Sequence, residues 1–569
     1  TSLPELRTLA KILVWLLESN TGDKGEISLR GPVEHGVWHR LSAEDEDCTL
    51  HRCQAAMQGV CPFFKARKAA DAAHLLVVNH PLLISDAMSG NAVLPEYRYL
   101  IVDEAHQLEE AVTNGLSFQI DESGLLRRIA DLGGPRRGLL GDILTNIRGL
   151  IPDKDQSKLE LFIETIDEAT TLMRNHVEAF FAQVQLFLKD VHNVRASDYT
   201  TFMRVVPQQR ERHSFAQVQA AWKVLSEYFE VIGDAMLRMT RALGKLREFN
   251  IPGYEDFISS SETAGNYLEE IRRHLHRFSV DPDSDTIYWL SQGSNQNELP
   301  TINAAPLHVG ALMEEYLWLK KDTVVLTSAT LRTGDNFSYI AERLYADQVP
   351  ALEVGSPFNY EESTLIYIPN DIPEPTDRQG YQRAVERGII ELAAALNGRV
   401  LVLFTSYAQL RQTAQAITPR LALGGITVYD QSDGTSRQAL MDGFRSTDKA
   451  VLLGTRSFWE GVDIPGDNLS ALVITRLPFA VPTDPVFAAR SETYSDAFND
   501  FAVPDAILRF RQGFGRLIRT RSDTGIVTVF DSRIVHKSYG PTFLESLPEC
   551  TVKYGTLDGM AAAAVDWLK

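Results

Sequence analysis

Two adjacent carboxylates, Asp103 and Glu104, follow a short apolar run at 99–102 in the segment YLIVDEAHQLEE. A buried parallel strand that ends in acidic side chains presents carboxylates to a metal ion and a water molecule in nucleotide-hydrolysing sheets. In that arrangement Asp103 would hold Mg²⁺ beside the phosphates, and Glu104 would orient and deprotonate the attacking water. The alternative is a charged helix N-terminus, where acidic residues interact favourably with the dipole. The presence or absence of partner motifs elsewhere in the chain decides between these two interpretations.

A second candidate is the arginine-bearing segment QGFGRLIR at 512–519, which is predicted to lie on a helix. On a helix, Arg516 and Arg519 would occupy neighbouring positions of one face. Their guanidinium groups keep their charge and form planar forks that suit a phosphoryl group in transfer. The alternative is an ordinary basic surface helix.

Two further stretches combine predicted strands with small or hydroxylated residues. Residues 454–466, GTRSFWEGVDIPG, contain glycines that allow a close approach of the backbone to a ligand. Residues 324–331, VVLTSATL, run from a predicted strand into the hydroxyls of Ser328 and Thr330. For the aromatic pair Phe458 and Trp459, packing in a core is favoured over stacking on bases.

Three cysteines, Cys48, Cys53 and Cys61, are spaced C-x4-C-x7-C. Thiolates this close together bind zinc or an iron–sulfur cluster, and either normally takes four ligands. His51 could complete a zinc site, or a further cysteine could lie upstream. The alternative is three unrelated cysteines. Cys550 is far away in the chain and is predicted to be a partly apolar, buried residue.

Length and charge limit the class of protein. With 569 residues and 44% hydrophobic content, the chain is long enough for about three to four domains. No apolar run reaches the roughly 18 residues that cross a bilayer. The net charge of −19 has the wrong sign for coating duplex DNA, although a local basic groove remains possible. Four cysteines do not make a disulfide framework, which favours a reducing, cytoplasmic setting.

The pattern of apolar residues predicts an α/β protein with a helical insertion. An N-terminal helix is expected over 1–19, with Ser2 as its cap. Residues 66–112 alternate between helices and strands, including a predicted strand at 74–79. Residues 113–285 show apolar spacing typical of helices and no strand signal. A hairpin-like pair, TIYWLSQ and LPTINAA, follows. From about 352, short β-rich runs separated by helices predict a second parallel sheet.

Together and in this order, the motifs DEAH, SAT, LVLFTSY (401–407), GTRSFWEGVDIPG and QGFGRLIR resemble those of superfamily 2 helicases, specifically the DinG/XPD branch of iron–sulfur helicases. They look like motifs II to VI of that family. The segments VVNHPLL (77–83) and SPFNY (356–360) match as well, and the run ending in Cys61-Pro62-Phe63 is similar to the cluster segment of DinG proteins.

The resemblance implies two RecA-like parallel-sheet domains, a helical arch insertion and the remnant of a small iron–sulfur domain. Residues 1–65 would form part of the cluster domain. Residues 66–112 and 286–345 would form the first RecA-like domain, with the arch at 113–285 inserted between them. Residues 346–569 would form the second RecA-like domain.

The implied function is an ATP-dependent DNA helicase that moves 5′→3′ on single-stranded DNA in repair, recombination or replication. Its cofactors would be ATP, Mg²⁺ and a [4Fe–4S] cluster. Its partners would be single-stranded and branched or forked DNA. The resemblance further implies a monomer in the bacterial cytoplasm, associated with the nucleoid and not with a membrane.

The resemblance also assigns roles by position. Asp103 and Glu104 would bind Mg²⁺ and activate water, and Arg519 would be the arginine finger. His106, Ser328 and Thr330 would couple hydrolysis to domain motion. Gln512 and Arg516 would face the nucleotide. Gly454, Glu460 and Asp463 would lie at the cleft near DNA and ribose. Ser406 and Tyr407 would lie near the DNA backbone, and Cys48, Cys53 and Cys61 would hold the cluster.

One departure from the family pattern is the lack of a G-x-x-x-x-G-K-[ST] loop in the sequence. The family order places that loop, and the first cluster cysteine, before Thr1, so we expect this chain to be a piece of a longer protein that by itself binds ATP poorly. Two other hypotheses are a non-hydrolysing nucleic-acid-binding module with a structural or redox-sensing cluster, and an ATP-driven nuclease whose acidic residues lie upstream.

Overall fold

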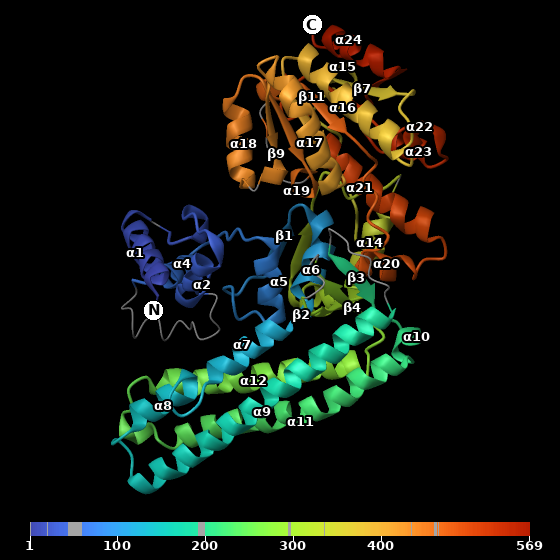
Figure 1. Ribbon diagram of the computed structural model, residues 1–569. Coiled ribbons are helices and arrows are strands. Elements are labelled where there is room, and N and C mark those ends of the chain that lie inside the picture. The colour runs from blue at the N-terminus through green and yellow to red at the C-terminus, as the bar shows by residue number, and fades with distance from the viewer. Residues whose placement is uncertain are drawn as a thin grey trace. The chain divides into compact units, whose positions relative to one another are not determined.

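The computed structural model describes residues 2–19, 21–43, 60–191, 200–293, 298–334, 336–433, 435–459, 464 and 466–569. The chain divides into two compact units. The first unit comprises Thr1–Tyr97 and Glu110–Leu307, and the second comprises Arg98–Glu109 and His308–Lys569. Figure 1 labels the helices and strands of both units.

The second unit contains a seven-stranded sheet in the order β13-β7-β12-β11-β8-β10-β9, and every strand pair in it is parallel. The strands are β7 (Thr364–Pro369), β8 (Val400–Leu403), β9 (Thr427–Asp430), β10 (Ala450–Gly454), β11 (Ala471–Ile474), β12 (Gly525–Val529) and β13 (Thr551–Gly555). The central strands are buried along their whole length, as expected for aliphatic runs covered on both faces. The predicted second parallel sheet is confirmed.

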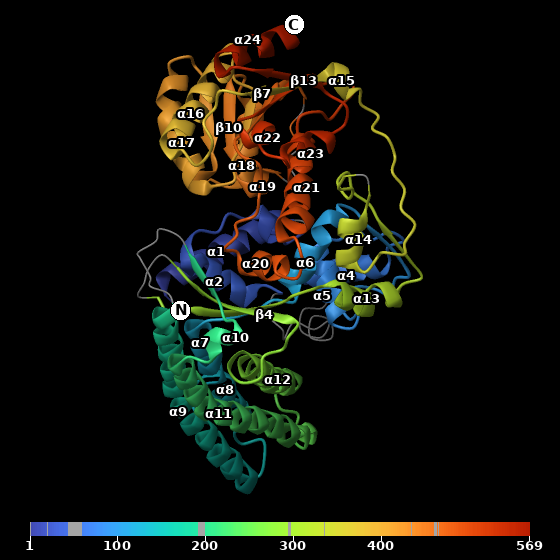
Figure 2. The same ribbon diagram turned by 90° about the vertical axis from the view of Figure 1, so that its right-hand side faces the viewer.

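Helices cover both faces of this sheet, which Figure 2 shows edge-on. One hydrophobic core is formed with α16 (Arg378–Ala395), α17 (Tyr407–Ala422) and α24 (Leu557–Trp567). The other is formed with α18 (Arg437–Ser446), α19 (Arg456–Trp459), α21 (Val503–Phe514), α22 (Arg533–His536) and α23 (Gly540–Glu545). Shorter elements of this part are α15 (Tyr360–Ser363), α20 (Pro485–Ser491) and the π-helical turn η7 (Ala497–Ala502). The predicted α/β fold class is confirmed.

A small parallel sheet in the same unit pairs β1 (Tyr99–Val102) with β6 (Thr323–Leu326). Along the chain, α6 (Leu108–Gly115) starts shortly after β1, and α13 (Gly310–Tyr316) and α14 (Ser338–Leu344) precede and follow β6. Val102 is buried, whereas Tyr99 and Ile101 are 72% and 71% exposed. Parallel strands are normally covered on both faces, so one face of this sheet is open.

The strand predicted at 74–79 is wrong. These residues form no ladder, and Leu75 and Val77 are 81% and 86% exposed. An apolar run becomes a strand only when a neighbour satisfies its backbone groups, and that pairing is a tertiary property that the run itself does not encode. The segment lies between α4 (Pro62–Asp71) and α5 (His80–Met88).

Most of the first unit is helical. Three long helices, α9 (Asp153–Val191), α11 (His213–Gly244) and α12 (Tyr254–Ser279), lie side by side with the shorter α7 (Glu122–Leu132) and α8 (Gly138–Ile147) (Figure 1). Their buried faces form one core rich in aromatic side chains: Phe180, Phe181, Phe187, Phe215, Trp222, Phe229 and Phe278. The helical pattern predicted for this stretch is present.

The expectation that residues 113–285 contain no strand is wrong. An antiparallel sheet in the order β2-β5-β4-β3 includes β2 (Phe118–Ile120) and β3 (Thr201–Arg204). Both strands are too short to show a periodic pattern, and they are recognisable only from their partners β4 (Thr286–Gln292) and β5 (Thr301–Pro306). The predicted hairpin of β4 and β5 is confirmed. The four-residue α10 (Pro207–Arg210) follows β3.

The predicted N-terminal helix is confirmed as α1 (Leu3–Glu18), which begins with a capping box between Ser2 and Glu5. With α2 (Gly31–Leu41) it encloses a small core. Among the residues that the structure describes, none of the helices has both the length and the apolar character needed to span a bilayer.

Candidate functional site

The acidic turn after β1 is attached to the neighbouring strand by backbone hydrogen bonds. Thr327 N–H donates to Val102 O at 2.9 Å, and Ala105 N–H donates to Thr327 O at 3.0 Å. Within the turn, Asp103 Oδ1 accepts from Glu104 N–H at 2.9 Å. Glu104 has φ +48°, in the left-handed region that costs a non-glycine residue free energy. The turn therefore holds both carboxylates at the carboxyl end of β1, exposed to solvent.

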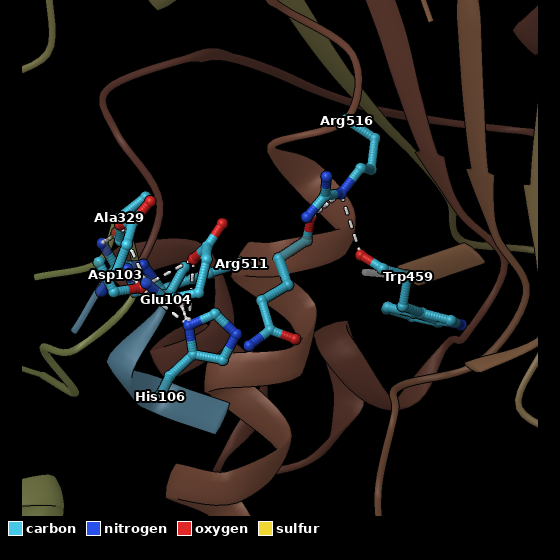
Figure 3. A network of polar contacts seen from close by, with 10 residues as sticks. Asp103, Glu104, His106, Ala329, Trp459, Arg511 and Arg516 are labelled. Carbon is cyan, nitrogen blue, oxygen red and sulfur yellow. Dashed lines mark hydrogen bonds and ion pairs between the residues drawn. The ribbon is translucent and has the colours of Figure 1, made fainter. Parts of the chain in front are cut away.

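Four of the predicted site residues meet in one polar network (Figure 3). His106 Nδ1 lies 2.8 Å from Ser328 Oγ, 3.2 Å from Thr330 Oγ1 and 3.4 Å from Glu104 Oε2. Ser328 Oγ in turn lies 3.2 Å from Glu104 Oε2, to which it can donate. The parallel register of β1 and β6 explains the meeting, because the carboxyl ends of neighbouring parallel strands reach the same edge of a sheet.

The oxygen atoms at this edge suit a hard cation. Asp103 and Glu104 are exposed, whereas the His106 side chain is only 6% exposed beneath them. Mg²⁺ is usually held by one or two carboxylates together with substrate phosphates and water, not by a cage made only of protein ligands. The described residues contain no cage of three or more His, Cys, Asp or Glu side chains. The acidic turn therefore fits a magnesium ion that arrives with a phosphorylated ligand.

The helix predicted for QGFGRLIR ends earlier than expected, so the placement of its arginines on one helical face is wrong. α21 ends at Phe514, with Gly515 as its C-cap. The Asp523 carboxylate accepts from the backbone N–H of Arg519 at 2.7 Å and of Thr520 at 2.8 Å, and these bonds stabilise a turn in place of a helix.

Arg516 bends back toward its own helix. Its Nε donates to Trp459 O at 3.0 Å and to Gln512 O at 3.2 Å. Figure 3 shows Arg516 and Trp459 apart from the group formed by Glu104 and His106. The structure thus gathers the acidic and hydroxyl residues, whereas the Arg516 guanidinium lies against the carbonyls of Trp459 and Gln512.

A residue not singled out from the sequence, Arg511, does reach the S-A-T segment. Its Nη1 donates to Arg332 O at 2.5 Å and its Nη2 to Ala329 O at 3.4 Å, and Figure 3 labels Arg511 and Ala329. Burial and the neighbouring Arg332 lower the pKa of Arg511 below its usual value. The sequence carried no signal for this role, because the partners are backbone carbonyls about 180 residues away.

The remaining predicted residues lie along the edge of the large sheet or outside the described residues. Gly454 ends β10, where an added Cβ would lie 2.4 Å from the ring of Phe458. Phe458 and Trp459 are buried, so their interpretation as core residues is confirmed. Gln512 is buried on α21. Glu460 and Asp463, and the cysteines Cys48 and Cys53, lie outside the described residues.

Three other predicted positions are described. Ser406 caps α17 by accepting from Gln409 N–H at 3.4 Å, and the half-exposed Tyr407 donates from its hydroxyl to Gln431 O at 3.4 Å. Cys61 precedes Pro62 at the start of α4 and is partly buried. Cys550, which was predicted to be buried, is partly buried and packs against a core, and this burial raises the pKa of its thiol to about 12.

Two family models match parts of this chain. A family model described as DEAD_2 matches residues 47–125, and one described as the helicase C-terminal domain matches residues 389–550. The chain is 30% identical over 563 residues to the 3′-5′ exonuclease DinG of Bacillus subtilis, covering 96% of this chain and 58% of that protein. The chain thus spans little more than half of that relative.

Two further relatives match over most of the chain. The ATP-dependent DNA helicase YoaA of Escherichia coli is 28% identical over 95% of this chain and 77% of that protein. The ATP-dependent helicase DinG of Mycobacterium tuberculosis H37Rv is 29% identical over 95% and 73%. A solved XPD helicase superposes with a TM-score of 0.46 at 15% identity, covering 88% of this chain and 77% of that one. The chain thus carries a DEAD_2 segment and a helicase C-terminal domain, and it is similar over most of its length to DinG and YoaA helicases.

Proposed function

We propose that this chain is the motor of an ATP-dependent DNA helicase that moves 5′→3′ along single-stranded DNA. The observation that carries the proposal is the network of Glu104, His106, Ser328 and Thr330 at the carboxyl ends of two adjacent parallel strands. The ATP-dependent helicases among the relatives support it, because they match over nearly the whole chain.

In the proposed reaction each part of the network has a task. Asp103 would hold Mg²⁺ on the phosphates of ATP, and Glu104 would take the proton of the attacking water. A change at Glu104 would reach Ser328 and His106 directly, because both lie within 3.4 Å of its carboxylate. Arg511 would transmit the change to α21, since its guanidinium donates hydrogen bonds to the carbonyls of Ala329 and Arg332. Arg516 and Arg519 remain candidates for contact with the nucleotide, and Arg519 remains our choice for the arginine finger.

The decisive experiment replaces Glu104 by Gln in the full-length protein and measures ATP hydrolysis with and without single-stranded DNA. Removing a general base should lower the DNA-stimulated rate about 10²- to 10⁴-fold while ATP still binds. Asp558→Asn is the control. Asp558 is an exposed residue of α24, and its carboxylate pairs with Arg387 of α16. An unchanged rate in Glu104→Gln would remove Glu104 from catalysis, and no turnover in the wild type would favour the non-hydrolysing module.

Direction of movement needs a separate measurement. Duplexes with a single-stranded tail at either the 5′ or the 3′ end should be unwound only when the tail is 5′. Unwinding from 3′ tails would contradict the proposed polarity.

We further propose that Cys48, Cys53 and Cys61 bind an iron–sulfur cluster with a fourth ligand. Cys61, the described member, is only partly buried at the start of α4, so its thiol can reach a ligand outside that helix. When bound, the cluster would link the three cysteine side chains through their thiolates. Cys53→Ser should abolish iron content and the broad visible absorbance while the large sheet stays folded. Stoichiometric zinc without iron in the purified wild type would show that the metal is zinc.

A further inference from the structure

A buried cluster of charges lies outside the site described above and joins elements that are distant in the chain. The Glu109 carboxylate accepts from Arg343 Nε at 2.6 Å through Oε2 and pairs with Arg490 Nη1 at 2.8 Å through Oε1. The side chains of Glu109, Arg343 and Arg490 are 12%, 11% and 7% exposed. We call these three residues the Glu109 cluster. They come from the first turn of α6, from α14 and from α20.

Aromatic rings keep water away from the Glu109 cluster. The Arg343 guanidinium lies 4.6 Å from the ring centroid of Tyr339 and 4.8 Å from that of Phe501. Phe501 also packs against Phe487, with ring centroids 4.9 Å apart. In such an environment the attraction between a carboxylate and two guanidiniums is screened much less than at the surface. The cluster therefore holds its three elements in a defined geometry.

Stability alone does not account for the Glu109 cluster. Taking ions out of water is costly, and apolar residues of similar volume often stabilise a fold equally well or better than a buried ion pair. Buried ion pairs can instead specify one arrangement of the elements that carry them. The elements here are the small-sheet part of the second unit, through Glu109 and Arg343, and the segment between β11 and β12, through Arg490.

That segment leads directly into the helix with the site residues. Phe501 belongs to η7, a π-helical turn that continues without a break into α21. Turns of this kind are rare and often occur at functional sites. At the other end of α21, Arg511 binds the carbonyls of Ala329 and Arg332. α21 is therefore attached to the small-sheet part at both ends, by the ring of Phe501 and by Arg511.

We propose that Glu109 is a positioning residue for ATP turnover. By holding Arg343 and Arg490 together, it fixes the start of α21 and thereby sets where Arg511 and Gln512 lie relative to the acidic turn. Glu109 follows Glu104 by five positions, so the same short segment carries the general base and the anchor of the opposing helix. The effect on turnover rests on the proposed function, whereas the anchoring of α21 does not.

The anchoring is tested by hydrogen exchange in the full-length protein without nucleotide. Glu109→Gln keeps the shape of the side chain and removes its charge, so backbone amides of residues 497–514 should exchange about tenfold faster than in the wild type. Asp558→Asn, which breaks an exposed pair with Arg387, should leave them unchanged. Unchanged exchange in Glu109→Gln would overturn the proposal, whether or not the protein hydrolyses ATP.

The role in turnover is tested by steady-state kinetics on the same proteins. Glu109→Gln should lower the DNA-stimulated kcat about tenfold and change the KM for ATP less than about twofold. Arg490→Met, which removes the partner charge, should show the same split, and Arg490→Lys should retain most of the wild-type kcat. If Glu109→Gln and Arg490→Met both keep the wild-type kcat, the proposal is wrong. It is also wrong if all three variants lose kcat equally and melt at a lower temperature than the wild type. A wild type without ATP turnover would instead refute the proposed function and leave the exchange result to decide the anchoring.

Discussion

At the scale of residues, the site depends on one exposed carboxylate above a buried imidazole. Glu104 is held in a left-handed backbone conformation, and its Oε2 is in contact with Ser328 and His106. A hydroxyl between a carboxylate and an imidazole can change its donor direction when the carboxylate changes its charge or its partner. The Glu104 carboxylate can therefore take part in the chemistry and also change the hydrogen bonds of the S-A-T segment as the reaction proceeds.

Arg511 connects the S-A-T segment to α21 through its side-chain hydrogen bonds. Arg511→Ala should lower DNA-stimulated ATP turnover about tenfold, because the carbonyls of Ala329 and Arg332 lose their common donor. Arg511→Lys should not restore it, since one ammonium group lacks the fork that spans two acceptors. The measurement is kcat with saturating DNA.

Arg509→Ala is the matched control for this prediction. Arg509 lies on the same helix and pairs at 3.0 Å with Asp505 one turn earlier, so its loss leaves the S-A-T carbonyls bonded. A loss of turnover in Arg509→Ala as large as that in Arg511→Ala would contradict the assigned role of Arg511.

At the scale of elements, α21 is positioned by close packing as well as by charge. A Cβ added at Gly513 would lie 2.7 Å from the Trp459 ring, which is buried in α19. The absence of a side chain at Gly513 thus lets the helix approach the edge of the large sheet. The close approach explains why a glycine stands inside a helix, where it would otherwise cost stability.

Gly513→Ala should therefore destabilise the second unit by about 1–3 kcal/mol, because overpacking outweighs the gain in helix propensity. Gly515→Ala is the matched control, since its Cβ would meet only backbone oxygens at ordinary contact distances of 3.5 Å and 3.7 Å. The midpoint of urea unfolding measures both. Equal stability of the two variants would show that α21 can shift away from Trp459.

At the scale of the whole molecule, the first unit has its own response to pH. The His274 ring stacks on Phe118 with centroids 4.1 Å apart. Burial, together with Arg273 and Arg277, lowers the pKa of His274 to about 4. Glu270 lies 3.9 Å from Nε2 and opposes this shift only weakly. His274 is therefore neutral in the folded unit at physiological pH.

The sign of the effect follows from proton binding. Between the unfolded pKa near 6.5 and the folded pKa near 4, the unfolded chain binds more protons, so stability falls as the pH falls through this window. The contribution of His274 is at most about 3 kcal/mol. His274→Phe keeps the stacking and should flatten the pH dependence of urea unfolding of the first unit between pH 6.5 and about 4. An unchanged slope in the variant would exclude His274 as its source.

The sequence by itself predicted which residues could form the site and most of the secondary structure. The apolar runs of the large sheet are short but are flanked by helical patterns, so the alternation of the two was enough to identify them. The acidic and hydroxyl motifs follow the strands that end at 102 and 326, and the carboxyl ends of these two paired parallel strands meet at one edge of their sheet. The meeting of Glu104, Ser328 and Thr330 therefore agrees with their positions in the sequence.

Only the tertiary structure decided which groups complete the site. The apolar run at 74–79 finds no strand to pair with, and β2 and β3 exist only because β4 and β5 satisfy their backbones. α21 ends before Arg516 because the Asp523 carboxylate competes for the backbone of the next turn. Arg511 and Glu109 act through partners more than 170 and 230 residues away, respectively. Contacts over such separations depend on packing, and no local pattern in the chain encodes them.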